Sequence, residues 1–130
     1  MIRVVIADDH TIVREGIRMI LNRVPEVTVV AEASNGREAV ALVNELKPDV
    51  VVMDVIMPEL DGIEAAGIIK RENPDTEIIA LSMYSDRCFI SEMLKAGARG
   101  FLLKDCASTE LAEALYAVRN GDVYLGPSVS

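Results

Sequence analysis

Five polar residues, each placed at the end of a short apolar segment, are the candidates for chemistry in this sequence of 130 residues. They are Asp8, Asp9, Asp54, Ser82 and Lys104. For any one of them alone, a polar residue that marks where a strand leaves the core is the simpler explanation. If the fold gathers all five, two carboxylates about 5 Å apart repel each other by roughly 3 kcal/mol at an effective dielectric near 20. Three carboxylates then need more positive charge than one lysine supplies, and oxygen ligands favour Mg²⁺ or Mn²⁺ over zinc.

The elements that must position these residues alternate between strand-like and helix-like patterns five times. The expected strands are residues 2–7, 27–31, 50–53, 77–81 and 100–103. Between and after them, apolar residues recur with the 3.6-residue period of amphipathic helices. The expected helices run from about 11 to 24, from 35 to 46 and from 62 to 71, with two more around 90–94 and 111–118.

Strict alternation with short connections predicts an α/β fold, a parallel sheet covered by helices on both faces. We expect a doubly wound five-stranded sheet in the order 2-1-3-4-5. The first and third strands are neighbours in that order, and ligands bind at the carboxyl ends of the strands where the winding reverses. The five candidate residues should therefore meet at one edge of the sheet.

Composition limits the function classes. Hydrophobic residues make up 51% of the chain, charged residues 26%, and the formal net charge is −8, which suits one soluble domain. This acidity argues against direct nucleic-acid binding, which needs clustered Lys and Arg. The apolar runs are only strand-length and the start lacks signal-peptide features, so we expect no membrane contact and a cytoplasmic location.

The remaining metal-binding residue types give weaker signals. His10 is the only histidine, and because one histidine makes no zinc site we expect it at a helix start. Cys88 and Cys106 form no CxxC pair and suit core or boundary positions in a reducing compartment.

Three segments together resemble the hallmark motifs of bacterial response-regulator receiver domains. They are Ile-Ala-Asp-Asp-His at 6–10, Val-Val-Met-Asp-Val-Ile-Met-Pro-Glu-Leu-Asp-Gly at 51–62, and Gly-Ala-Arg-Gly-Phe-Leu-Leu-Lys-Asp at 97–105. The resemblance covers essentially the whole chain, and the motifs occur in the right order on the right strands. The Asp-Asp-His opening, the Leu-Leu-Lys-Asp ending and the tail at 121–127 are similar to the NarL/FixJ class. The resemblance implies the flavodoxin-like receiver fold.

The resemblance also implies a role for each acidic residue. Asp54 corresponds to the phosphoacceptor of the family. Asp9, Asp54 and the backbone carbonyl of Ile56 would ligate Mg²⁺ directly, whereas Asp8 would act partly through water.

The phosphoryl group and the signal would depend on the later motifs. Lys104 would bind one phosphoryl oxygen, and the Ser82 hydroxyl would bind another. Ser82 would move toward the phosphoryl group and Phe101 would enter the space it leaves, which changes the surface of the fourth helix, fifth strand and fifth helix. The simpler explanation of Phe101 is an ordinary core aromatic residue.

The resemblance implies partners that the residues themselves do not reveal. The phosphodonor would be a sensor histidine kinase or a small acyl phosphate, and phosphorylation could produce a homodimer. Residues 1–121 would form the receiver domain, and 122–130 would begin a linker to a helix-turn-helix domain, absent from this chain, through which alone DNA would be bound. The domain would catalyse its own phosphorylation and dephosphorylation and would not be a conventional turnover enzyme.

Two departures from the common pattern affect the expected chemistry. Asp105 follows Lys104 where many receivers have proline, so no cis peptide bond is expected there. Ile56 and Tyr84, two residues beyond Asp54 and Ser82, are bulky. We hypothesise that they screen the acyl phosphate from water and lengthen its lifetime.

Three alternatives share parts of this pattern. A flavodoxin-type electron carrier would need a phosphate-binding loop after the first strand and aromatic residues around a flavin, whereas this chain has Asp8-Asp9 and no tryptophan. An aspartyl-phosphate phosphatase typically has a second aspartate two residues after the nucleophile, where this chain has Ile56. A pseudo-receiver would keep the fold without the intact set of reactive residues.

Overall fold

The computed structural model describes residues 1–84, 86–127 and 129 of the chain. Strands and helices alternate along it from the N-terminus. They are β1 (Ile2–Ala7), α1 (Thr11–Asn22), β2 (Val27–Ala33), α2 (Gly36–Leu46), β3 (Val50–Asp54), α3 (Gly62–Glu72), β4 (Glu77–Ser82), α4 (Arg87–Ala96), β5 (Gly100–Leu103), α5 (Ala107–Arg119) and β6 (Tyr124–Leu125). A single 3₁₀ turn over Lys104–Cys106 connects β5 to α5.

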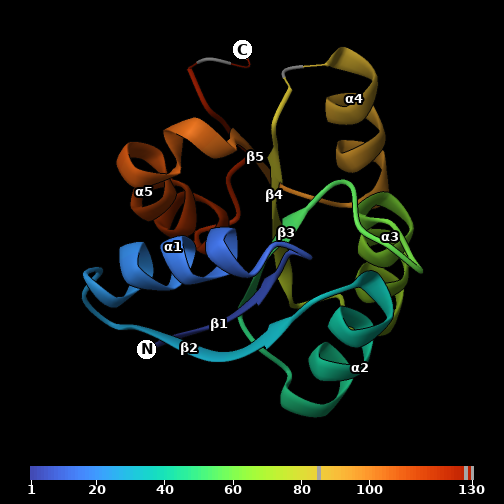
Figure 1. Cartoon of the computed structure of the whole chain (residues 1–130), viewed down its shortest axis with the longest axis horizontal. Coiled ribbons are helices and arrows are strands. Elements are labelled where there is room, and N and C mark those ends of the chain that lie inside the picture. The colour runs from blue at the N-terminus through green and yellow to red at the C-terminus, as the bar shows by residue number, and fades with distance from the viewer. Residues whose placement is uncertain (85, 128, 130) are drawn as a thin grey trace.

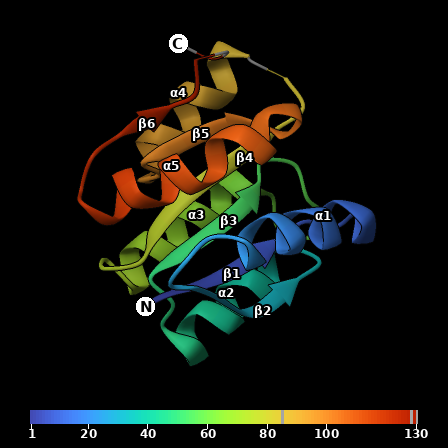
Figure 2. The ribbon, with the colours of Figure 1, turned by 90° about the vertical axis from the view of Figure 1, so that its left-hand side faces the viewer.

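The strands form one parallel sheet in the order β2-β1-β3-β4-β5-β6. Figure 1 shows α1 and α5 on one side of the sheet and α2, α3 and α4 on the other. Seen from the α1/α5 side, the strands run side by side from β2 at one edge to β6 at the other (Figure 2). The predicted α/β class, the doubly wound arrangement and the order 2-1-3-4-5 are confirmed.

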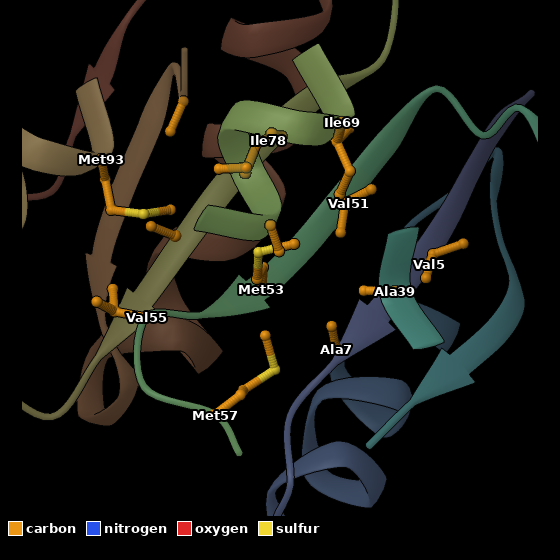
Figure 3. Close-up of a cluster of buried hydrophobic side chains, with 14 of the residues drawn as sticks. Val5, Ala7, Ala39, Val51, Met53, Val55, Met57, Ile69, Ile78 and Met93 are labelled. Carbon is orange, nitrogen blue, oxygen red and sulfur yellow. The ribbon is translucent and has the colours of Figure 1, made fainter. Parts of the chain in front are cut away.

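Alternate residues of the central strands build two separate cores. On β3, Val51 and Met53 pack toward α2, α3 and α4, while Val50 and Val52 pack toward α1 and α5. All five residues of β3 are buried, which explains its continuous apolar sequence. Figure 3 shows the first core, where Val51 and Met53 lie beneath Ile69 of α3. The sheet is thereby held rigidly between two helical layers.

Local sequence signals account for where several helices begin. The side chains of Asn35, Asp61 and Asp86 accept hydrogen bonds from backbone N–H groups in the first turns of α2, α3 and α4. His10 is the residue before α1, as predicted, but its side chain makes no capping bond. Gly97, with φ 112°, ends α4 in the left-handed conformation that glycine tolerates best.

The sixth strand was not predicted. Tyr124 and Leu125 pair with Gly100 and Phe101 of β5, and Leu125 and Val129 pack against the core on the α4 side. A two-residue strand is too short to show alternation in a sequence, so residues 122–130 read only as the start of a linker. The linker interpretation itself remains a prediction, and its residues 128 and 130 lie outside the described residues.

Within the described ranges, every helix is too short or too polar to cross a lipid bilayer.

Candidate functional site

The five predicted residues lie together at the carboxyl edge of the sheet. Asp8 and Asp9 follow β1, Asp54 ends β3, Ser82 ends β4, and Lys104 follows β5. Because parallel strands end at the same edge, residues separated by as many as 96 positions are brought within contact distance. Four of them, Asp9, Asp54, Ser82 and Lys104, line a cavity of about 180 Å³ together with His10, Ile56, Met83 and Tyr84. Asp8 is fully buried, next to Lys104.

Asp54 lies at the floor of this cavity and is 5% exposed. Its Oδ2 accepts a hydrogen bond from Lys104 Nζ at 3.1 Å, and its Oδ1 accepts one from the backbone N–H of Ile56 at 3.2 Å. Burial and the negative charge of Asp8 raise the pKa of Asp54, although Lys104 and the Ile56 N–H act in the opposite direction. The surroundings therefore hold an aspartate whose negative charge is only partly compensated.

Lys104 is the cation that joins two of the carboxylates. Its Nζ lies 2.8 Å from Asp8 Oδ2 and 3.1 Å from Asp54 Oδ2, and its side chain is 9% exposed. Burial opposes the charge of the ammonium group, but the contacts with Asp8 and Asp54 outweigh it, and the pKa of Lys104 is raised. Lys104 is thus held in its protonated form between the two acids.

The loop after β1 carries the remaining acidic groups. Asp8 is fully buried, and its Oδ1 accepts a hydrogen bond from the backbone N–H of His10 at 2.8 Å. The ring Nδ1 of His10 lies 3.2 Å from both Asp8 Oδ1 and Asp9 Oδ1. The prediction placed His10 only at a helix start, whereas the structure also places its ring against the acidic pair.

This arrangement fits a hard divalent cation. One potential ligand atom from each of Asp8, Asp9, His10 and Asp54 can be chosen so that all lie within 4.8 Å of one another. Asp8 Oδ2 is buried, and although Lys104 lies beside it, no well-aligned hydrogen bond reaches it from the described residues. Three carboxylates facing one ammonium leave an excess of negative charge. An acidic pocket of this kind, dominated by oxygen ligands, is typical of Mg²⁺ binding.

Ser82 lines the same cavity and is 3% exposed. Its Oγ accepts a hydrogen bond from the backbone N–H of Tyr84 at 3.1 Å. That bond leaves the hydroxyl proton available to an incoming acceptor. Ser82 is therefore placed to donate into the cavity, while its own position is fixed by the loop that follows β4.

Phe101 was predicted to move on phosphorylation, and that role stays a prediction. The ring is already fully buried and belongs to the same core as Met93 and Ile78. On β5, Phe101 pairs in register with Ala80 of β4, which belongs to the same core.

The mouth of the cavity is bordered by apolar side chains. Ile56 is 56% exposed, Met83 64% and Tyr84 62%. Ile56 and Tyr84, the two bulky residues predicted to screen Asp54, both line the cavity, and so does Met83.

Two further residues support the site, and sequence reasoning missed their roles. A Cβ atom at Gly62 would collide with the carbonyl oxygen of Asp54, so only glycine permits α3 to begin so close to β3. A glycine at a helix start was a usable signal. Arg14 donates a hydrogen bond to the carbonyl oxygen of Asp8 at 2.6 Å. No signal marked Arg14, because an arginine on a helix normally indicates a solvated face.

Comparison with known proteins identifies relatives along almost the entire chain. The family model described as response regulator receiver domain matches residues 4–116. The chain is 40% identical over 129 residues to the transcriptional regulatory protein DegU of Brevibacillus brevis, and the match covers 99% of this chain but 55% of DegU. The chain therefore spans little more than half the length of this relative.

Solved structures agree with this match. A two-component response regulator of the LuxR family from Aurantimonas sp. SI85-9A1 superposes with a TM-score of 0.94 and 36% identity, covering 99% of this chain and 92% of that one. The isolated receiver domain of RcsB from Salmonella enterica serovar Typhimurium, solved in the presence of the phosphomimetic BeF₃⁻, gives 0.90 and 35% identity, covering 98% of this chain and 95% of that one.

Proposed function

We propose, because this chain belongs to the response regulator receiver domain family, that it receives a phosphoryl group on Asp54 in a Mg²⁺-dependent reaction. The observation that carries this proposal is the partly compensated carboxylate of Asp54, buried in the acidic cavity and touched by Lys104 at 3.1 Å. Family membership also decides against the electron-carrier and phosphatase alternatives.

The proposed reaction forms one bond and breaks one. An oxygen of the Asp54 carboxylate attacks phosphorus, and the bond from phosphorus to the donor breaks, with its electrons leaving on an imidazole nitrogen or a carboxylate oxygen. A carboxylate is a weak nucleophile, so the rate must come from positioning and from stabilisation of charge on the phosphoryl oxygens. Bound Mg²⁺ would supply part of that charge stabilisation.

The residues of this chain would divide the remaining work. The Lys104 ammonium, held between Asp8 and Asp54, is available to one phosphoryl oxygen. The Ser82 hydroxyl, whose oxygen already accepts the Tyr84 N–H bond, donates to another. Asp8 and Asp9, together with Asp54 and the carbonyl of Ile56, would hold the metal.

Phosphorylation is proposed to act on the α4-β5-α5 surface through Ser82 and β5. Adding negative charge at Asp54 draws Ser82 and Lys104 toward the new oxygens. Lys104 follows β5 directly, and Ser82 pairs in register with Leu103, so both movements reach the same strand. From its buried position on β5, Phe101 is proposed to enter the space that Ser82 leaves.

Three proposals concern the protein in its pathway. A sensor histidine kinase would be the phosphodonor, and phosphorylation would favour a homodimer. A DNA-binding domain joined through the segment after residue 121 would carry the output, which the naming of DegU as a transcriptional regulatory protein supports. Such a protein would work in the cytoplasm.

The apolar mouth of the cavity supports the proposed long lifetime of the acyl phosphate. Ile56 and Tyr84 border the space through which water must approach Asp54. If they screen it, replacing Ile56 by asparagine should shorten the lifetime of the phosphorylated form, measured as the loss of the added mass over time after the phosphodonor is removed.

Intact mass before and after incubation with acetyl phosphate and Mg²⁺ tests the central proposal. We expect one phosphoryl group per chain on the wild type, none on Asp54→Ala, and none on the wild type when Mg²⁺ is chelated. Ser34→Ala is a matched control, because Ser34 lies outside the cavity and should leave phosphorylation unchanged. Phosphorylation of Asp54→Ala to the wild-type extent would contradict the assignment.

A further inference from the structure

We propose that Arg14 is a positioning residue that braces the acidic loop after β1 and thereby sets the affinity of the site for its divalent cation. The inference rests on the proposed function, because it presupposes that Asp8 and Asp9 bind a cation. It assigns Arg14 no contact with the metal or with the phosphoryl group.

Arg14 reaches the acidic loop from the first turns of α1. Its Nη1 donates to the backbone carbonyl oxygen of Asp8 at 2.6 Å, and its Nη2 lies 3.4 Å from Thr11 Oγ1. The side chain is 16% exposed, so the guanidinium group is largely withdrawn from solvent. An arginine side chain this buried has lost hydration, which these hydrogen bonds and ion pairs replace.

Glu32 at the end of β2 fixes the guanidinium group from the other side. Arg14 Nε donates to Glu32 Oε1 at 3.2 Å, and Arg18 Nε donates to Glu32 Oε2 at 2.5 Å. The next residue of β2, Ala33, accepts a hydrogen bond from the backbone N–H of Asp8 at 3.0 Å. The N–H and the carbonyl of Asp8 are therefore both tied to the end of β2, one directly and one through Arg14.

Arg14 holds the loop at a place where carboxylates repel one another. Asp8 is fully buried beside Lys104, and the carboxylates of Asp9 and Asp54 face it across the cavity. Without a cation, their repulsion favours any loop movement that separates them. The carbonyl of Asp8 belongs to the peptide that joins Asp8 to Asp9, so holding it limits how far the backbone of both residues can move away from Asp54. Residues that orient metal ligands in this way commonly contribute tenfold or more to metal affinity.

The proposal and simple electrostatics predict opposite changes in Mg²⁺ affinity when Arg14 is removed. Arg14 is a cation close to a cation site, so if its charge alone mattered, removing it would strengthen Mg²⁺ binding. If Arg14 acts by holding the loop, removing it weakens binding. Glu32, which Arg14 shares with Arg18, offsets part of that charge, and we expect the positioning effect to be the larger of the two.

Titration calorimetry with Mg²⁺ on wild type, Arg14→Met and Arg18→Met provides the test. Arg18 is the matched control, because it contacts the same Glu32 but makes no contact with the acidic loop among the described residues. We expect the Kd for Mg²⁺ to rise roughly tenfold in Arg14→Met and less than about twofold in Arg18→Met. At saturating Mg²⁺, the phosphorylation rate of Arg14→Met with acetyl phosphate should return close to that of the wild type.

A purely structural role would give a different pattern, with Tm lowered in the absence of metal and no change in the Kd for Mg²⁺. Equal Kd values for Arg14→Met and Arg18→Met, or tighter binding by Arg14→Met, would overturn the proposal. If Arg14→Met does not fold, Glu32→Gln weakens the same brace while keeping the side-chain volume, and should raise the Kd by a smaller factor. Failure of the wild type itself to bind Mg²⁺ would instead remove the proposed function.

Discussion

Buried polar side chains lie at both ends of the sheet, but their charges and hydrogen bonds are compensated at one end and not at the other. At the carboxyl end, the fully buried Asp8 and the nearly buried Asp54 share one ammonium group, and their repulsion remains. At the amino end, buried polar groups find hydrogen-bonding partners. Thr76, 3% exposed, donates to the carbonyl oxygen of Pro48 at 2.8 Å, and Asn73, 6% exposed, donates to Asn44 Oδ1 at 2.7 Å.

Two lysines show the same contrast. Lys47 at the amino end donates a hydrogen bond to Asn73 Oδ1 at 2.8 Å. Asn73 is neutral, so this contact is a hydrogen bond and not an ion pair. Lys104 at the carboxyl end forms ion pairs with both Asp8 and Asp54. The amino end resembles a structural network in which each buried group is satisfied. The carboxyl end keeps an excess of negative charge that a bound cation would compensate, and the cation and Lys104 could then bind a phosphoryl group. Uncompensated charge of this kind indicates a functional site, whereas the satisfied network at the amino end does not.

The largest expected effect comes from removing the shared cation. Lys104→Met leaves Asp8 and Asp54 facing each other without compensation, so the free energy of unfolding in the absence of metal should fall by about 3 kcal/mol, the lower end for breaking a buried ion pair. Urea denaturation measures this change. Millimolar Mg²⁺ should recover part of the lost stability, because it replaces the missing positive charge.

The same substitution at the other end is the control for this prediction. Lys47 is exposed, and Lys47→Met removes one hydrogen bond whose acceptor, Asn73, keeps other contacts, so the loss should stay below about 1 kcal/mol. Mg²⁺ should not change that loss. Similar losses in the two variants would contradict the distinction between a compensated and an uncompensated end.

A smaller effect is expected from a buried hydrogen bond at the amino end. Thr76→Val keeps the shape of the side chain but leaves the carbonyl oxygen of Pro48 without its donor, and should cost about 1.5 kcal/mol of unfolding free energy. Because the network is structural, the Kd for Mg²⁺ and the phosphorylation rate of the folded variant should equal those of the wild type. A change in either would show that the two ends are coupled.

Much of the carboxyl end could be predicted because its residues follow strands with strong apolar patterns. Parallel strands must end at one edge, so the position of Asp54 after β3 and of Lys104 after β5 determines that they meet. The contact of Arg14 with Asp8 depends on how α1 lies against β2, which periodicity does not encode. The sixth strand depends on two residues that pair with the edge of the sheet, which is too short a segment to show a pattern.

The amino end could not be predicted for a related reason. Asn44, Asn73 and Thr76 lie in turns and helix ends, where polar residues are expected whatever they contact. Their hydrogen bonds join segments up to 29 residues apart, through side chains whose directions a sequence does not reveal. Only a chemically unusual combination, such as three aspartates with one lysine, distinguishes a site from such a background.

The last and smallest expected effect is a gain in stability from Asp54→Asn, which directly tests whether the negative charge of Asp54 is uncompensated. Burial and the charge of Asp8 raise the pKa of Asp54 above its ordinary value of 3.8. Ionised Asp54 therefore destabilises the folded state at all pH values above its folded pKa. As pH falls through that pKa, the native protein takes up a proton before the unfolded chain does, and the penalty disappears. Asparagine carries no such penalty, so the variant should be more stable than the wild type near neutral pH.

The gain should be on the order of 1 kcal/mol, because losing the repulsion from Asp8 is largely offset by losing the attraction to Lys104. Urea denaturation at a series of pH values measures it, and the advantage of Asp54→Asn should shrink as pH falls and vanish near the pKa of an unfolded aspartate. Mg²⁺ should stabilise the wild type more than the variant. If the difference in unfolding free energy between Asp54→Asn and the wild type did not change with pH, the charge of Asp54 would be well compensated in the folded protein. The proposed difference between the two ends of the sheet would then be wrong for Asp54.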